Sequence, residues 1–171
     1  SGALDLFDDN EIRAVLGHEL GHALSHHALY RTLSHLLIQL FMQRFRMGYA
    51  AFWAVIAALS EWSRKAELSG DRAGLLCAQD PEVCYRVEMK LAGGSNTGEM
   101  SLDAFRAQAQ EYHSSGELVD SALKVGSLLF RSHPFSVSRL FELEKWVESG
   151  DYRRIIEGNY PARGAEDEAS F

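Results

Sequence analysis

The chain has 171 residues, of which 46% are hydrophobic, and this is long and apolar enough for one packed domain. Its formal net charge is −7 and it contains no basic cluster, which argues against nucleic acid as the main partner. We expect residues 1–163 to form a single domain and the acidic residues 164–171 to form a disordered tail.

The first predicted helix covers residues 9–30. The side-chain oxygens of Asp8, Asp9 and Asn10 can cap its first turn, where Glu11 adds a negative charge. Apolar residues then recur at helical spacing, at Ile12, Val15, Leu16, Leu20, Ala23 and Leu24. Side chains near the middle of such a helix are held in register, because only the ends of helices fray.

The middle of this helix contains His18, Glu19 and His22, which form an HExxH motif. The two histidines are four residues apart, so they lie on one helical face and can bind the same metal ion. Glu19 lies next to the first of them, where it can take a proton from a metal-bound water. Gly21 costs about 1 kcal/mol in a helix relative to alanine. Its missing side chain predicts that another backbone approaches closely at this point.

Two more helices are predicted over residues 33–47 and 49–77, with Gly48 between them. The apolar run at 48–59 has 12 residues, whereas a membrane span takes roughly 20. We expect this run to form a buried helix behind the site. Two alternatives stay open, which are contact with a membrane surface through residues 33–62 and an interface for a segment outside the chain.

Two histidines leave a zinc site short of one protein ligand. The pattern HExxHxxGxxH does not continue here, because Ser25 and Ala28 occupy its glycine and histidine positions. Glu67, on the helix predicted over 49–77, instead completes a His, His, Glu set with a fourth position open for water. Asp71 is four residues further along the same face, where it can accept the free N–H of a zinc histidine.

These assignments have alternatives among neighbouring residues. Glu61 is the alternative third ligand, while Glu67 and Asp71 have nearby arginine or lysine residues as alternative ion-pair partners. The other histidines of this part of the chain are expected at the surface or around the ligands rather than on the metal; they are His26, His27 and His35. His113 is expected at the surface too.

The rest of the chain is predicted to be helical with short breaks, so the expected fold class is mainly α. Helices are expected over residues 81–91, 101–113, 118–130, 137–147 and 151–156, with a glycine-rich loop at 93–98. Two cysteines are too few for a disulfide scaffold, and Cys77 is expected to be a buried thiol. Free thiols favour a reducing, cytoplasmic compartment, with membrane association as the alternative.

Several short sequences resemble one metallopeptidase family. They are residues 11–15 ahead of the HExxH motif, residues 63–67, residues 71–74, and Ser132-His133-Pro134 followed by Arg139. This combination resembles the gluzincin peptidases that include HtpX and the CAAX prenyl proteases. The resemblance spans residues 4–145, with long unmatched stretches between the matching words.

The resemblance implies a zincin-like catalytic domain with one zinc ion per chain. It assigns the metal to His18, His22 and Glu67, and the general base to Glu19. It further implies that Asp71 supports His18 and that His133 stabilises the oxyanion. Members of the family usually carry β-strands ahead of the zinc helix, and one of these strands lines the substrate cleft. Since the sequence begins without methionine, we expect those strands to be missing from this excerpt.

These expectations converge on a zinc-dependent endopeptidase that acts on proteins or peptides. The alternative is a latent or non-catalytic zinc-containing module of the same fold, acting in binding or as a chaperone. A purely structural zinc site is closed by four protein ligands. Three ligands beside a carboxylate base therefore favour catalysis. The residues do not specify the substrate or the oligomeric state.

Overall fold

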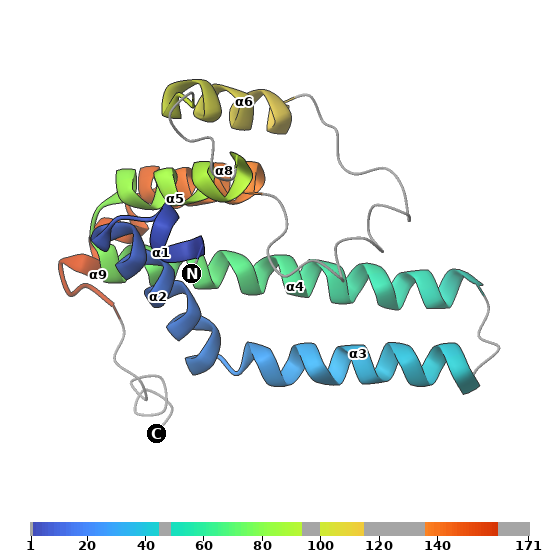
Figure 1. Ribbon diagram of the computed structural model, residues 1–171. Coiled ribbons are helices and arrows are strands. Elements are labelled where there is room, and N and C mark those ends of the chain that lie inside the picture. Colours follow the sequence, from blue (N-terminus) through green and yellow to red (C-terminus); the bar gives the residue numbers. More distant parts are fainter. Residues whose placement is uncertain (1, 45–48, 94–99, 115–135, 161–171) are drawn as a thin grey trace.

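The computed structural model describes residues 2–44, 49–93, 100–114 and 136–160, and every regular element within these ranges is a helix (Figure 1). The prediction of a mainly α fold is confirmed. The elements are α1 (Gly2–Leu6), α2 (Asp9–Leu24), α3 (His27–Arg44), α4 (Tyr49–Ala78), α5 (Pro81–Gly93), α6 (Leu102–Ser114), α8 (Ser136–Glu148) and α9 (Asp151–Ile156). The helix expected over 118–130, the joint at Gly48 and most of the glycine-rich loop lie outside the described residues, as does the acidic tail.

The single helix predicted over residues 9–30 is wrong, because the chain turns between Leu24 and His27. The backbone of His26 adopts a left-handed conformation with φ of 54°. At the end of α2 the N–H of Ser25 donates to the carbonyl of Gly21, and the N–H of His26 donates to that of Ala23. Such a left-handed residue ends an α-helix and redirects the chain. Hydrophobic periodicity continues across the break, so the pattern alone gave no sign of it.

The first turn of α2 is fixed by a capping box. Asp8 Oδ1 accepts hydrogen bonds from the backbone N–H groups of Asn10 and Glu11, each at 2.9 Å, and Glu11 Oε2 accepts one from the N–H of Asp8. Glu11 is fully buried, and its carboxylate lies 2.6 Å from Lys90 Nζ on α5. Through this ion pair, the capping residue Glu11 also links the first turn of α2 to α5.

The crossing of α2 and α4 depends on glycine. A Cβ atom added to Gly21 would lie 2.6 Å from the Cβ of Ala73, and one added to Gly74 would lie 2.7 Å from the carbonyl oxygen of Ala14. Neither separation is compatible with a real side chain, so alanine at either position would push the helices apart. The close approach predicted at Gly21 is confirmed, and it holds the face of α2 that carries His18 and His22 against α4.

The hydrophobic core lies between the end of α4 and helices α5, α6 and α8. Leu75 and Leu140 are completely buried in it. Cys84 also belongs to the core, and burial raises the pKa of its thiol to about 12. Cys77 is free but exposed, so the expected buried thiol at this position is wrong. It faces Gly17 across the α2–α4 crossing, at an edge that remains open to solvent.

Helix α3 and the first part of α4 form a hairpin, residues 27–60, that extends away from the core (Figure 1). The apolar run at 48–59 was expected to be buried, but between residues 54 and 59 only Ile56 is buried. Among the described helices, only α3 runs beside this part of α4 (Figure 1). Among the described residues, no helix has the length and hydropathy needed to cross a membrane.

Candidate metal centre

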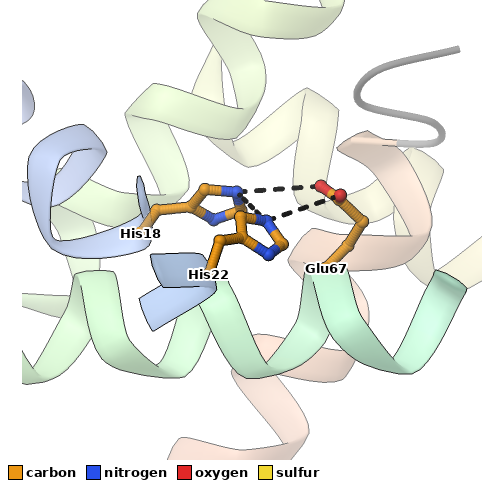
Figure 2. Close-up of side chains that lie close together, drawn as sticks. All are labelled: His18, His22 and Glu67. Atoms are coloured by element: carbon orange, nitrogen blue, oxygen red, sulfur yellow. Dashed lines mark hydrogen bonds and ion pairs between the residues drawn. The ribbon is translucent and has the colours of Figure 1, made fainter. Parts of the chain in front are cut away.

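Three side chains converge where α2 passes α4. His18 and His22 extend from α2, and Glu67 extends toward them from α4 (Figure 2). The two Nε2 atoms are 3.0 Å apart, His18 Nε2 is 3.7 Å from Glu67 Oε2, and His22 Nε2 is 3.5 Å from Glu67 Oε1. His18 and Glu67 are buried, while His22 is partly exposed. The structure thus brings together the three residues that the sequence predicts as ligands.

The spacing of these atoms fits a tetrahedral zinc site. Zinc bonds of roughly 2.0–2.1 Å at a tetrahedral angle place neighbouring ligand atoms about 3.3 Å apart. The observed separations of 3.0, 3.5 and 3.7 Å lie on both sides of this value. Two imidazole nitrogens and one carboxylate oxygen are also a donor set that zinc accepts, with one position left for water.

Asp71 lies behind His18, as the sequence predicts. Its Oδ1 is 2.9 Å from His18 Nδ1, and both carboxylate oxygens accept hydrogen bonds from Arg139. Burial alone would raise the pKa of Asp71, but the hydrogen bonds and charge of Arg139, together with His18, lower it. An ionised carboxylate accepts hydrogen bonds and donates none. His18 Nδ1 therefore holds the proton, and the lone pair of Nε2 faces the metal position.

Arg139 joins this carboxylate to another that sequence reasoning missed. Its Nη2 is 2.9 Å from Glu88 Oε1, and both side chains are buried. Burial raises the pKa of Glu88 to about 8, although the charge of Arg139 acts in the opposite direction. One guanidinium thus faces Asp71, Glu88 and, at 4.0 Å, Glu67. One sequence feature could have indicated the role of Glu88. It lies four residues after Cys84 and therefore on the buried, mostly apolar face of α5.

His22 is supported by another histidine. His22 Nδ1 is 2.8 Å from Nδ1 of His27, and the ring of His27 stands edge-on to Trp62 on α4, with centroids 5.9 Å apart. Burial and then the charge of His18 lower the pKa of His22, which keeps its imidazole neutral. The sequence placed His27 near the ligands but did not pair it with His22. On a continuous helix, residues five apart lie on different faces, so the sequence gives no reason to pair His22 with His27. The turn at His26 brings the two rings together.

Glu19 is exposed beside the ligands. It lies at the edge of a cavity of about 80 Å³ that also reaches His18. Apolar side chains line much of the cavity, among them Phe7, Val15, Val87, Leu91 and Leu143. Its other walls include the charged residues Asp71, Glu88 and Arg139. A carboxylate in this position is accessible to water and to a bound ligand, as a general base must be.

The remaining candidates are placed as follows. Glu61 is exposed and paired with Arg64 at 2.8 Å, so it does not join the ligand group. His26 and His35 are exposed, and His113 stacks on Phe141 with ring centroids 3.9 Å apart. His133 lies outside the described residues, so its predicted role at the oxyanion stays a prediction.

Comparison with known protein families agrees with this geometry. The model of peptidase family M48 matches residues 1–147, which is most of the chain and includes His18, His22 and Glu67. The chain belongs to peptidase family M48. Members of this family are metal-dependent peptidases, so the expected gluzincin resemblance is confirmed at the level of the family.

One curated M48 relative is the plastoglobule-localized metallopeptidase 48, chloroplastic, of Arabidopsis thaliana. It is 34% identical to this chain over 156 residues, which cover 90% of the chain. The match covers 45% of the relative, so the chain spans about half the length of the curated M48 protein that it matches. No solved structure matches the chain.

Proposed function

We propose that this chain is a zinc-dependent endopeptidase in which His18, His22 and Glu67 bind the metal. The observation that carries the proposal is the convergence of these three side chains, whose donor atoms all lie within 4.8 Å of one another. The membership of family M48 supports peptide-bond hydrolysis as the reaction and proteins or peptides as the substrates. The domain is proposed to extend over residues 1–163, with 164–171 as a tail.

The protein's own groups prepare the site before any substrate binds. Asp71 keeps the Nδ1 proton on His18, and His27 orients the ring of His22, so that both Nε2 lone pairs face the same point. A zinc ion held there supplies Lewis acidity and lowers the pKa of a water ligand toward about 7. Glu67 contributes a negative charge that attracts the cation, although the same charge also acts to raise the pKa of His22 against the effect of burial.

Glu19 is the proposed general base. Its carboxylate accepts a proton from the attacking water and later delivers it to the departing amine. The cavity beside Glu19, lined by apolar residues and by the Asp71, Glu88 and Arg139 cluster, is the proposed place for one side chain of the substrate. His133 is proposed, on the resemblance alone, as a donor of a hydrogen bond to the tetrahedral oxyanion.

The test is to measure zinc content and digestion of an unfolded protein such as reduced casein, for the wild-type chain and for Glu19→Gln. We expect one zinc per chain in both, with cleavage lost by at least about a thousandfold in the variant, because base and metal act together. Glu157→Gln removes an exposed carboxylate that belongs neither to the ligand group nor to the cavity lining and should leave cleavage unchanged.

Two outcomes would count against the proposal in different ways. Full cleavage by Glu19→Gln would remove Glu19 from its role as base. Stoichiometric zinc without cleavage by the wild-type chain would favour the latent or non-catalytic alternative.

A further inference from the structure

Two buried polar atoms beside the cavity lack a hydrogen-bond partner among the described residues. Glu88 Oε1 is 2.9 Å from Arg139 Nη2, and the Ser136 hydroxyl acts to lower the pKa of this carboxyl group, but Glu88 Oε2 has no hydrogen bond. Arg139 Nη1 has none either, because its contact with Glu67 Oε2 is 4.0 Å long. Buried polar atoms are normally hydrogen-bonded, so these two require a partner from outside the described groups.

The cavity connects both residues with the metal centre. Glu88 and Arg139 line it, and so do His18 and Glu19. Glu19 is exposed whereas Glu88 and Arg139 are buried, so a ligand that enters from solvent meets Glu19 first. Much of the remaining lining is apolar, namely Phe7, Ala14, Val15, Val87, Leu91 and Leu143. An apolar pocket with a few polar groups is the usual form of a site that binds a side chain with an apolar stem and a polar end.

The hydrogen-bonding pattern of the two atoms favours an amide. Arg139 Nη1 can only donate, whereas Glu88 Oε2 accepts when the carboxyl group is ionised and donates when it is protonated. Burial raises the pKa of Glu88 to about 8, so both forms are populated near that pH. A primary amide has a carbonyl oxygen and an NH2 group, and it can therefore pair with both atoms whichever form Glu88 adopts.

A charged side chain suits the two atoms less well. The ammonium group of lysine could donate to Glu88, but it would face the cation of Arg139 and leave Nη1 without an acceptor. A carboxylate would lie beside Asp71 and Glu19, which border the same cavity, and could bond only the protonated form of Glu88. Either group would also lose the hydration of a full charge.

We propose that the cavity binds a substrate side chain that ends in a primary amide, with glutamine as the natural residue of suitable length. The carbonyl oxygen of the amide accepts a hydrogen bond from Arg139 Nη1, its other end pairs with Glu88 Oε2, and its methylene groups contact the apolar lining. Glu88 therefore determines specificity. The proposal rests on the endopeptidase function proposed above, because it concerns which peptides that site accepts.

The first test compares alanine peptides that differ only in one central residue, which is glutamine, methionine, glutamate or lysine. Methionine matches the length of glutamine but leaves Glu88 and Arg139 unpaired. We expect kcat/KM for the glutamine peptide to exceed that for the methionine peptide by at least about tenfold. The glutamate and lysine peptides should be cleaved no faster than the methionine peptide. Equal cleavage of the glutamine and methionine peptides, or a preference for either charged residue, would overturn the proposal.

Variants on α5 assign the preference to Glu88. Glu88→Met cannot hydrogen-bond an amide and should reduce the ratio of glutamine to methionine cleavage by at least about fivefold. Glu88→Gln keeps a polar atom at this position and should hold the ratio within about twofold of the wild-type value. Glu82→Met replaces an exposed acid of the same helix, outside the cavity, and should leave the ratio unchanged. An unchanged ratio in a zinc-binding Glu88→Met chain would overturn the role of Glu88. The wild-type ratio decides if that variant does not fold.

Binding separates this proposal from the proposed peptidase function. Fluorescence anisotropy measures the affinity of the labelled peptides for zinc-loaded Glu19→Gln, which is expected to bind peptides without cleaving them. Tighter binding of the glutamine peptide, with no cleavage by the wild-type chain, would support the side-chain preference and reject the peptidase function. Cleavage of the glutamine and methionine peptides at equal rates would support the peptidase function and overturn the preference.

Discussion

The two histidines proposed as ligands are one helical turn apart, yet their surroundings differ. His18 is buried and faces a carboxylate, which an arginine and a second carboxylate support from α8 and α5. His22 is partly exposed and faces the neutral ring of His27, where the hairpin begins. A charged partner raises the basicity of a histidine ligand more than a neutral one does. Asp71 and the groups around it, on the His18 side, should therefore determine both metal affinity and the free energy of unfolding. His27, on the His22 side, should mainly orient the His22 ring.

The largest effect is expected from Arg139→Leu, which leaves Asp71 and Glu88 buried without their cation. Breaking a buried ion pair from one side costs about 3–5 kcal/mol. Urea unfolding of the metal-free variant should show a loss of this size. The matched control is Arg64→Leu, which removes an exposed arginine from its pair with Glu61 and should cost under about 1 kcal/mol. Equal losses of unfolding free energy in Arg139→Leu and Arg64→Leu would show that the buried ion pairs of Arg139 stabilise the fold no more than an exposed pair does.

The next effect concerns the pH dependence of stability in the metal-free chain. The pKa of Glu88 is raised from 4.5 to about 8, so the folded chain holds this proton more tightly than the unfolded chain does. The contribution of Glu88 is fully present below pH 4.5 and is lost as the pH rises through about 8.

We expect Glu88 to lower the unfolding free energy by a few kcal/mol across this range of pH, because each pH unit between the two pKa values contributes up to about 1.4 kcal/mol. Glu88→Gln cannot ionise and should remove this part of the slope. The measurement is urea unfolding at a series of pH values with the chelator present. An identical slope in the variant and the wild-type chain would place the ionisation elsewhere.

Asp71→Asn tests the His18 side of the metal centre. The amide keeps the shape of the carboxylate but removes its charge, and its oxygen is a weaker acceptor for His18 Nδ1. Zinc affinity should fall by about 10–100-fold, the usual cost of losing such a partner. Competition with a fluorescent zinc chelator measures this loss. An affinity within about twofold of the wild-type value would contradict the role of Asp71.

His27→Phe tests the His22 side and should have the smallest effect. Phenylalanine keeps a ring against Trp62 but cannot accept a hydrogen bond from His22 Nδ1. We expect zinc affinity to fall by less than about tenfold, because the lost partner is neutral. His27→Asn places an amide oxygen near the position of Nδ1 and should restore part of the loss. A larger loss in His27→Phe than in Asp71→Asn would reverse the comparison.

The sequence predicted the convergence of His18, His22 and Glu67 better than it predicted the residues that surround them. The four-residue spacing of His18 and His22, and of Glu67 and Asp71, fixes which side chains share a helical face, so local spacing was enough. Arg139 is 68 residues from Asp71, and no local pattern indicates that the two meet or that Glu88 joins them. The close approach at Gly21 was predictable because glycine is costly in a helix without such a reason.

The hairpin illustrates the opposite case. Hydrophobic periodicity shows that residues are apolar but not what covers them, so the run at 48–59 was assigned to the core although its described part is mostly exposed. The break at His26 was missed for a related reason, since it depends on a single left-handed residue inside a periodic pattern. Both errors concern the hairpin that extends from the core. Its direction and exposure depend on contacts between distant residues, which hydrophobic periodicity does not report.

The most direct measurement of the central claim is X-ray absorption at the zinc edge, together with zinc titration, for the wild-type chain and for Glu67→Gln. The account predicts one zinc per chain, bound by nitrogen and oxygen atoms only, with two imidazoles, and a large loss of affinity in the variant. Sulfur in the coordination shell, or a variant that binds zinc as tightly as the wild-type chain, would contradict it.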